Sequence, residues 1–483
     1  MNDNATKGSP TNVWALISGT QFTIGSDDQL TELRGKYSTE PGDKVGQDKL
    51  QEDWHAQLAK IRVKVGTLLK IDTVSLLLGA GASVGCGGLL IGKIPLELEL
   101  DLVEQAGLPG DESSIPAWLL CFYLGAAHAG MASIAVPTTR EQIIDRCAEL
   151  AAATAEALPV NYELLLSQLW RWRSALPATG GLLRLGDAPG IDLVGEHLED
   201  CIKRTAGALA NSCQLPTEDK VDGTGAFEDL LRKILTRPLN LKRGNIFTLN
   251  YDTLVEQAAD AGGVVLIDGF VGTLRRIFRP ECYDQDLYFP AQTTEGRVHR
   301  LDRVAHLYKL HGSITWRSTQ SEWDNPYGVT CVQGRGGADD GLLIYPTPAK
   351  LGETLGMPYA ELFRRFSSCV SRSQSTLIVV GYGFGDEHVN AIVRQALLTP
   401  SFTLVIVDPN PTSPFVQRLR AAGDRRVWVF SGQTFGTLAG FVQHVLPDLR
   451  DEDVRRRVVE TYRALGPVAP TPEKSVRESE DAE

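Results

Sequence analysis

A turn of small residues is the first place in the chain that could bind a ligand. It follows the apolar run Val74–Leu78 and reads Gly79, Ala80, Gly81, Ala82 and Ser83. Glycines at such a turn let backbone N–H groups approach a pyrophosphate at the start of a helix. The usual Gly-x-Gly-x-x-Gly fingerprint is incomplete, since its sixth position is Val84. A tight turn without a ligand is therefore an open alternative.

Two polar side chains follow a second apolar run, Asn245–Leu249. Asn250 and Asp252 come directly after it in the sequence Thr-Leu-Asn-Tyr-Asp. An amide and a carboxylate at the end of a buried strand could hold a ligand, because ligands of open parallel sheets bind beyond the carboxyl ends of the strands. The same two residues could instead turn the chain and cap a helix over Thr253–Ala259.

A histidine follows a third apolar run, Leu307–Leu310. His311 stands before a glycine and a serine, which leave the backbone beside it unobstructed. Histidine is the side chain best suited to exchange a proton near pH 7, so His311 is a candidate general base. A structural role is the alternative for any single histidine.

Two further predicted strands are followed by residues that are typical of turns. Gly381 and Gly383 follow the apolar run Leu377–Val380, and the spacing again suggests close approach of a ligand. Asp408 and Asn410 alternate with prolines after the next run. For this last site a proline-rich turn is the competing interpretation.

Six apolar runs predict the strands that would position these residues. They are Val74–Leu78, Asn245–Leu249, Leu307–Leu310, Leu377–Val380, Leu404–Val407 and Val427–Phe430. Short continuous apolar runs are typical of parallel strands covered by helices on both faces. Helical spacing after the fourth run, with Asp386 placed to cap that helix, supports alternation of strands and helices. The sequence thus predicts an α/β fold with a doubly wound, Rossmann-like parallel sheet of about six strands.

The remaining sequence predicts the domain organisation. Residues 1–45 form an N-terminal extension of unclear fold, and residues 46–450 form the main domain. Helical patterning with few strand signals predicts a helical insertion at about residues 98–240. Residues 451–483 are expected to form a C-terminal helix followed by an acidic disordered tail.

Composition narrows the class of protein. The net charge of −12 argues against direct nucleic-acid binding over the whole surface. The eight cysteines include no Cys-x-x-Cys pair, so we expect no zinc ribbon and reduced thiols in a cytoplasmic protein. No apolar signal segment occurs in Met1–Pro10. The segment Ala117–Val136 is apolar enough to need a membrane check, but a buried helix pair broken near Gly125 and Gly130 is the favoured interpretation.

The five sites in this order resemble the sirtuins. More closely, they resemble the sirtuin-like, NAD-consuming effectors of bacterial antiphage defence, which typically carry Gly-Ala-Gly-Ala-Ser, Asn-Tyr-Asp, Leu-His-Gly-Ser-Ile and Gly-Tyr-Gly-Phe-x-Asp. All four motifs occur in this sequence, and the resemblance covers roughly residues 70–445. It implies an oligomeric enzyme that takes NAD as its substrate and acts in defence. Because relatives often act with a separately encoded ATPase, it also implies a possible partner of the translocase type.

The resemblance also implies roles for individual residues. Asn250 would hold the ribose and a water, Asp252 would meet the nicotinamide carboxamide, and His311 would be the general base. The residues expected to bind the rest of NAD are Gly79, Ala80, Gly81, Ala82, Ser83, Thr248, Gly381, Gly383, Asp408 and Asn410.

Two departures from the deacylating sirtuins bear on the reaction. Their Gly-Ile-Pro-Asp-Phe-Arg run is not found after Ser83, and their zinc-ribbon cysteines are missing from the sequence. Without that module water is the expected acceptor, which gives hydrolysis of NAD to nicotinamide and ADP-ribose. A protein deacylase or ADP-ribosyltransferase, and a non-catalytic module that binds NAD or ADP-ribose for assembly, are the alternatives.

Overall fold

The fold is taken from a computed structural model. It describes residues 13–90, 93–107, 115–129, 136–158, 160, 162–176, 182–183, 193–215, 224–289, 299–319, 321–332, 341–343 and 358–450. The helix and tail predicted after residue 450 lie outside this part of the chain.

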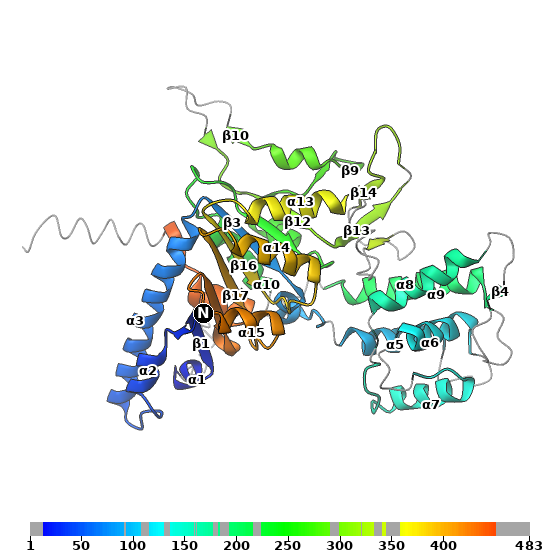
Figure 1. The fold of residues 1–483 in the computed structure, drawn as a ribbon, viewed down its shortest axis with the longest axis horizontal. Helices are drawn as coiled ribbons and strands as arrows, with labels where there is room; N and C mark the ends of the chain where they lie inside the picture. Colours follow the sequence, from blue (N-terminus) through cyan, green and yellow to red (C-terminus); the bar gives the residue numbers. More distant parts are fainter. Residues whose placement is uncertain are drawn as a thin grey trace, which may run out of the picture.

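A nine-stranded, mainly parallel sheet forms the centre of the molecule (Figure 1). Its strand order is β2-β1-β18-β17-β16-β3-β6-β12-β7. The strands are β1 (Thr20–Ile24), β2 (Asp27–Asp28), β3 (Thr73–Leu78), β6 (Asn245–Thr248), β7 (Val265–Ile267), β12 (Val304–Lys309), β16 (Ser375–Val380), β17 (Phe402–Val407) and β18 (Val427–Ser431). From β18 to β7 every pairing is parallel, whereas β1 pairs antiparallel with β18 and with β2. The predicted α/β class with a doubly wound parallel sheet is confirmed.

The sheet has three strands more than the six apolar runs predicted. The additional strands β1, β2 and β7 lie at its two edges. β2 consists of two aspartates, so it carries no apolar run. β7 is the short apolar stretch Val-Leu-Ile after Val264, which the six predicted strands do not include, and its side chains are at most half-buried. In β1 polar residues separate Phe22 from the neighbouring apolar positions, although Phe22 itself is fully buried. Edge strands of this kind give only a weak apolar signal.

Helices cover both faces of the sheet because successive side chains of each strand point to opposite sides. Leu76 and Leu78 of β3 pack in one core cluster, and Leu77 packs in another. The first cluster includes α3 (Lys44–Leu69), α10 (Thr224–Ile234) and α11 (Leu254–Gly262). The second includes α13 (Tyr359–Val370), α14 (Glu387–Leu397) and α15 (Pro414–Ala421).

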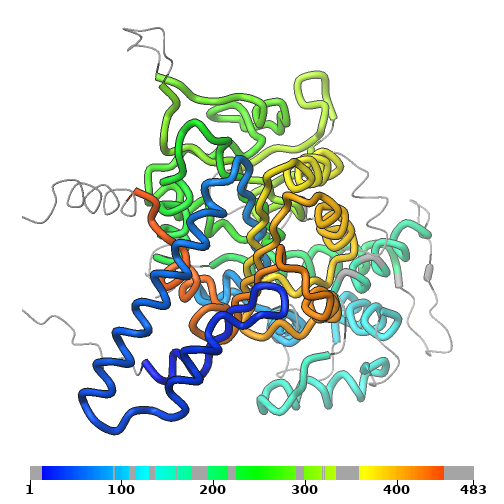
Figure 2. Tube along the Cα trace, turned by 60° about the vertical axis from the view of Figure 1, so that its left-hand side comes forward, coloured from blue at the N-terminus to red at the C-terminus, as the bar shows by residue number. Residues whose placement is uncertain are grey.

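Five helices form a lobe with a core of its own beside the sheet (Figures 1 and 2). They are α5 (Ile94–Gln105), α6 (Ala117–Ala129), α7 (Arg140–Ala151), α8 (Tyr162–Ala175) and α9 (Gly195–Ser212). Within the lobe the buried carboxylate of Glu99 accepts hydrogen bonds from Arg146 and Tyr123. The next helix, α10, packs against α11 and the central sheet instead.

The apolar segment after residue 116 forms one helix that continues through Gly125. The predicted break at this glycine is therefore wrong. A side chain at Gly125 would meet Leu165 and Leu169 of α8, so the glycine serves close helix packing. Gly130 lies outside the described residues. Among those that are described, no helix is both long and apolar enough to cross a membrane.

A smaller antiparallel sheet combines strands from before and after β12 in the chain and has the order β15-β13-β14-β9-β8. Its strands are β8 (Phe270–Val271), β9 (Arg276–Phe278), β13 (Gly312–Ser318), β14 (Val329–Cys331) and β15 (Gly341–Leu343). The remaining elements are α1 (Val13–Ser18), α2 (Thr31–Lys36), α4 (Ala80–Ser83), η1 (Val84–Cys86), β4 (Leu182–Leu183), β5 (Leu193–Val194), η2 (Pro280–Asp284), β10 (Tyr288–Phe289), β11 (His299–Arg300), α16 (Gly432–Phe435), α17 (Leu438–Gly440) and η3 (Phe441–Val445).

Candidate active site

Ser83 connects the two polar residues that follow β6. Its hydroxyl donates a hydrogen bond of 2.7 Å to Asp252 Oδ2 and accepts one of 2.9 Å from Asn250 Nδ2. The Asn250 amide also donates to the carbonyl oxygen of Gly79 at 3.0 Å. Adjacent parallel strands β3 and β6 end in register, which brings these loops together at the carboxyl edge of the sheet. The structure therefore joins the first and second sequence motifs into one hydrogen-bonded cluster.

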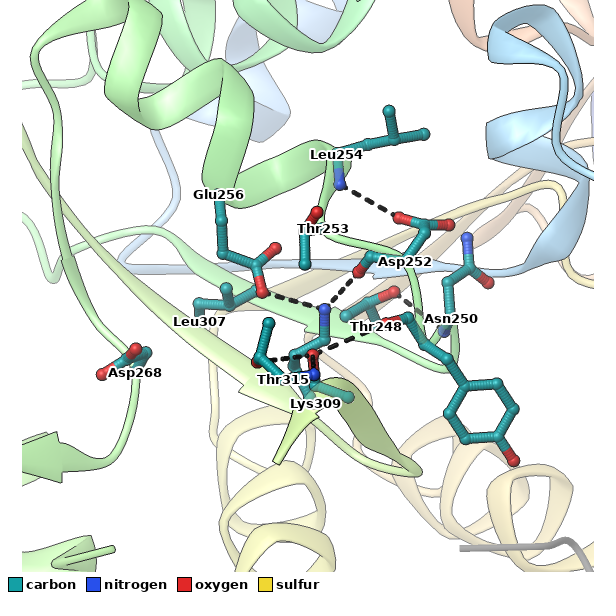
Figure 3. Close-up of polar contacts among 12 residues, drawn as sticks. Thr248, Asn250, Asp252, Thr253, Leu254, Glu256, Asp268, Leu307, Lys309 and Thr315 are labelled. Carbon is teal, nitrogen blue, oxygen red and sulfur yellow. Dashed lines mark hydrogen bonds and ion pairs between the residues drawn. The ribbon is translucent and has the colours of Figure 1, made fainter. Parts of the chain in front are cut away.

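The loop that carries Asn250 and Asp252 is held by further hydrogen bonds (Figure 3). Thr248 Oγ1 accepts from the Asn250 backbone N–H at 3.0 Å, and Asp252 Oδ1 accepts from the Leu254 N–H at 3.2 Å. Asp252 thus contacts the first turn of α11 while its second oxygen contacts Ser83. The N-cap of α11 is Thr253, whose side chain makes no capping hydrogen bond, so Asp252 turns the chain before the helix and does not cap it. The turn-forming role and the place in the cluster, which the sequence presented as alternatives for Asp252, coexist.

A buried ion pair lies beneath this loop and was not predicted. Lys309, at the end of β12, donates to the backbone carbonyl oxygen of Asp252 and pairs with Glu256 of α11 at 2.9 Å (Figure 3). The Lys309 side chain is 4% exposed. Burial raises the pKa of Glu256, and the ammonium of Lys309 opposes that rise. The sequence contains one indication of this ion pair, a lysine within the apolar run Leu307–Leu310. A lysine is almost never fully buried without a partner.

His311 is placed by the end of the next strand. It is buried, and its Nε2 atom lies 3.3 Å from Asp386 Oδ2, with both side chains about one-tenth exposed. The other oxygen of Asp386 accepts from the His388 N–H and caps α14, as predicted. Asp386 was expected only as a cap. The loop of the fourth motif, which begins at Gly381, brings Asp386 next to the histidine, where a carboxylate can orient an imidazole and stabilise its charged form.

The glycines of the first and fourth motifs serve contact between two backbone loops. A Cβ atom on Gly79 or Gly81 would collide with the backbone at Gly381, which has a φ of +64°. The Gly81 N–H donates to the Gly381 carbonyl oxygen at 2.8 Å, and the Ala82 N–H donates to the Gly79 carbonyl oxygen at 2.9 Å. These two N–H groups would have to exchange partners before they could hold a phosphate.

The remaining predicted residues lie farther along the same edge. Gly383 is exposed and has no atom within 4 Å of an added Cβ. Asp408 follows β17 and is half-buried, and its Oδ1 accepts from the exposed Asn410 N–H at 2.8 Å. Desolvation by burial raises the pKa of Asp408, and this backbone hydrogen bond opposes the rise. The structure places these residues at the edge without joining them to the Ser83 cluster.

Two side chains from the loops of the site pack against the helical lobe. Tyr251, between Asn250 and Asp252, packs against the core of the lobe, as does Ile314 after the histidine motif. The Ile314 N–H also donates to the Tyr251 carbonyl oxygen at 3.1 Å. The lobe therefore borders the site and can restrict access of water to it.

Neither a metal site nor a thiol nucleophile is evident here. Across the ranges that the structure describes, no group of three or more histidine, cysteine or acidic side chains could hold a metal ion. Cys86 lies near Asp252, but burial, together with that carboxylate, raises its thiol pKa to about 11. A thiol with so high a pKa is a poor nucleophile at neutral pH.

Fold and site together define an α/β protein with a polar site at the carboxyl edge of a doubly wound sheet. Residues 244–424 match the model of the SIR2-like domain family. This match covers more than a third of the chain and contains Asn250, Asp252, His311 and Asp386, whereas the Gly79–Ser83 turn lies outside it.

Two comparisons complete this result. No curated protein matches the chain significantly. Solved structures that are similar to parts of it include a Sir2 homologue in complex with NAD, at 12% identity and a TM-score of 0.30, covering 80% of this chain and 94% of that one. A second is a serine-to-alanine mutant of a Sir2 homologue in complex with ADP-ribose, at 12% identity and a TM-score of 0.28, covering 83% and 98%.

Proposed function

We propose that this protein is an NAD glycohydrolase that cleaves NAD to nicotinamide and ADP-ribose. The observation that carries the proposal is that Asn250 and Asp252, joined through Ser83, and His311 follow the ends of the adjacent parallel strands β6 and β12 at one sheet edge. The family match supports it, because the matched segment contains all three residues. An amide, a carboxylate and an imidazole suit a reaction in which a bond must be oriented and a water activated.

The dimensions of the edge suit an extended dinucleotide. From β12 to β17 the sheet advances four strands, which corresponds to about 19 Å at the usual spacing between neighbouring strands. We place the nicotinamide end beside Asn250 and His311 and the adenosine end beside Asp408 and Asn410. The turn at Gly79 lies between them, where the pyrophosphate would pass.

In the proposed reaction the bond between ribose C1′ and the nicotinamide nitrogen breaks, and its electron pair goes to nicotinamide. The leaving group already carries a positive charge, so it needs no general acid, and the ribose gains oxocarbenium character. Water attacks C1′ and loses its proton to His311. Asp386 orients the imidazole and stabilises its protonated form. Asn250 positions the ribose and the water, and Asp252 accepts from the carboxamide of nicotinamide.

Chromatography of NAD incubated with the purified protein tests the proposal. We expect nicotinamide and ADP-ribose from the wild type and from His55→Ala, an exposed histidine on α3. Asn250→Ala and His311→Ala should each lower the rate at least about a hundredfold, the usual scale of general acid–base catalysis. NAD that survives with the wild type, but binds in a direct titration, would favour the non-catalytic module. ADP-ribose attached to an acyl group or a macromolecule would favour the transferase alternative.

We also propose that assembly controls the activity, as the resemblance to defence effectors implies. An enzyme that depletes NAD harms its own cell, so a homo-oligomer or a partner such as a translocase-type ATPase would hold it in check. The specific rate of NAD cleavage should then change with protein concentration or on addition of the partner. A rate per molecule that is constant over a hundredfold dilution would contradict control by self-assembly.

A further inference from the structure

A cavity of about 310 Å³ lies at the opposite edge of the central sheet from the candidate active site. Asn245, the first residue of β6, lines it together with His306, its partner in register on β12. Farther along the same two strands follow Asn250 and His311. At the usual rise per strand residue the two ends are about 16 Å apart. The cavity is therefore separate from the site described above.

The lining of this cavity is strongly basic. Its cationic side chains are Lys242, Arg243, Arg300, Arg364, Arg365 and Arg372. Only Asp284 and Asp286 supply negative charge within the lining. Such a concentration of arginines stands out in a chain whose net charge is −12. Clefts lined by one sign of charge concentrate ligands of the opposite sign.

Ion pairs neutralise this lining only in part. Arg243 and Arg300 share one carboxylate, that of Asp286, at 2.5 and 2.6 Å. Arg364 and Arg365 share Glu361, and Arg365 also pairs with the exposed Asp284. Lys242 pairs with Asp72 at 2.9 Å. Because the arginines share carboxylates, the lining keeps a net positive charge.

Arg372 is the most available of these side chains. It is exposed, and within the described parts of the chain its guanidinium contacts no carboxylate. It follows directly after α13, the helix that carries Arg364, so the two arginines border the cavity from the same wall. Lys242 and Arg243 precede β6 and border it from another.

His306, which lines the same cavity, carries an unsatisfied polar atom. Its Nδ1 atom lies 3.3 Å from Asn245 Oδ1, while the buried Nε2 atom has no hydrogen-bond partner in the described structure. Burial and the nearby Arg243 lower the pKa of His306 to about 4, so the ring is neutral at pH 7. Nε2 is an acceptor while Nδ1 donates to Asn245 Oδ1, and it becomes a donor if the Asn245 amide is reversed.

We propose that this cavity binds a small anion that carries at least two phosphate groups, either inorganic pyrophosphate or a nucleoside diphosphate. Guanidinium groups bind phosphate oxygens in pairs, and arginines on two walls can engage two phosphates at once. The volume lies at the small end of ligand pockets, which favours a small ligand. This site is independent of the proposed NAD cleavage.

Calorimetric titration of the full chain with pyrophosphate tests the proposal. We expect Arg364→Ala/Arg372→Ala to weaken binding at least about tenfold, because charge-assisted hydrogen bonds are lost. The matched control is Arg394→Ala/Arg425→Ala, which removes the same charge from exposed arginines outside the cavity. Arg394 resembles Arg364 in pairing with a glutamate of its own helix. The control should bind like the wild type.

Further titrations identify the ligand and distinguish binding at this cavity from binding at the candidate active site. Orthophosphate should bind at least about tenfold more weakly than pyrophosphate, since it engages one wall only. ADP that binds more tightly than pyrophosphate would assign the cavity to nucleotides. Pyrophosphate binding should persist in Asn250→Ala and His311→Ala. Equal binding to the two double variants, equal binding of orthophosphate, or loss of binding in the active-site variants would overturn the proposal, whatever the outcome of the NAD assay.

Discussion

Asp386 links a structural role to a chemical one. One of its oxygens caps α14, and the other faces His311 Nε2 at 3.3 Å. We predict that Asp386→Asn lowers the kcat for NAD cleavage about tenfold to a hundredfold, because the imidazolium loses its carboxylate. Asparagine is as good an N-cap as aspartate, so the melting temperature should change little. The KM should also stay near that of the wild type, since the residue acts through His311.

The alanine variant separates these two roles. Asp386→Ala removes the cap as well, which should cost about 1 kcal/mol of unfolding free energy in addition to the loss of rate. Steady-state kinetics and thermal melting of both variants provide the check. An Asp386→Asn enzyme with wild-type kcat would mean that the carboxylate does not assist the histidine.

His306 makes the stability of the protein depend on pH. Burial lowers its pKa in the folded protein to about 4 from the ordinary histidine value of 6.5. The unfolded chain therefore binds a proton first as the pH falls, and stability decreases between about pH 6.5 and pH 4. We predict that the wild type loses about 2 to 3 kcal/mol more unfolding free energy than His306→Gln between pH 7 and pH 4.5.

Urea unfolding at the two pH values measures this difference. The exposed histidine variant His55→Gln is the control and should keep the pH dependence of the wild type. Parallel curves for the wild type and His306→Gln would show that this ring is protonated equally in both states. Pyrophosphate, if it binds as proposed, should shift the wild-type curve at neutral pH as well.

The sequence predicted those site residues that directly follow an apolar run. Asn250, Asp252 and His311 each follow an apolar run, and the sheet edge gathers them. Asp386 and Lys309 were not assigned to the site, because their part in it depends on partners that are distant in the sequence. Ser83 was expected beside a phosphate, whereas its hydroxyl bonds to two of the other site residues. The sequence indicates which strand a residue follows. The packing of the fold decides which side chains from distant parts of the sequence contact that residue.

Substitution of two glycines in one loop should have very different effects on stability and on NAD binding. A Cβ on Gly381 would collide with the backbone of Gly81 and Ala82, and its φ of +64° disfavours other residues. Gly383 has open space around it. We predict that Gly381→Ala lowers the unfolding free energy by more than about 2 kcal/mol and abolishes NAD binding, since the two loops must separate. Gly383→Ala should change both by little.

Denaturant unfolding and a direct NAD titration of both variants test this pair. A stable Gly381→Ala protein that binds NAD would show that the contact between the two loops is dispensable.

At the scale of elements the sequence predicted the six buried strands well, because continuous apolar runs mark strands covered on both sides. It missed β1 and β2, in which polar residues interrupt or replace the apolar run, and β7, whose apolar run is only three residues long.

The segment before α3 belongs to the core of the whole molecule. Ile17, Phe22 and Leu30 are fully buried, and Phe22 stacks on Phe430 with the ring centroids 4.1 Å apart. We predict that deletion of residues 1–37 costs more than about 5 kcal/mol, since each such side chain contributes about 1.5–3 kcal/mol. Deletion of residues 1–12 leaves these side chains in place and is the control. Thermal melting compares the two.

Loss of this segment would also expose the edge of β18, and exposed strand edges promote aggregation. A longer deletion variant that melts like the wild type would show that β1 adds nothing to the stability of the sheet.

The antiparallel pairing of β1 with β18 has a consequence for synthesis of the chain. Gln21 faces Ser431 in this pairing, so the first strand to leave the ribosome must wait for nearly the whole polypeptide before its partner exists. During that interval Phe22 has no aromatic neighbour to cover it, and transiently exposed apolar strands attract chaperones or aggregate. Ribosome-bound chains that stop before Val427 should therefore remain sensitive to protease near their N-terminus, and chains that extend past Ser431 should become resistant there.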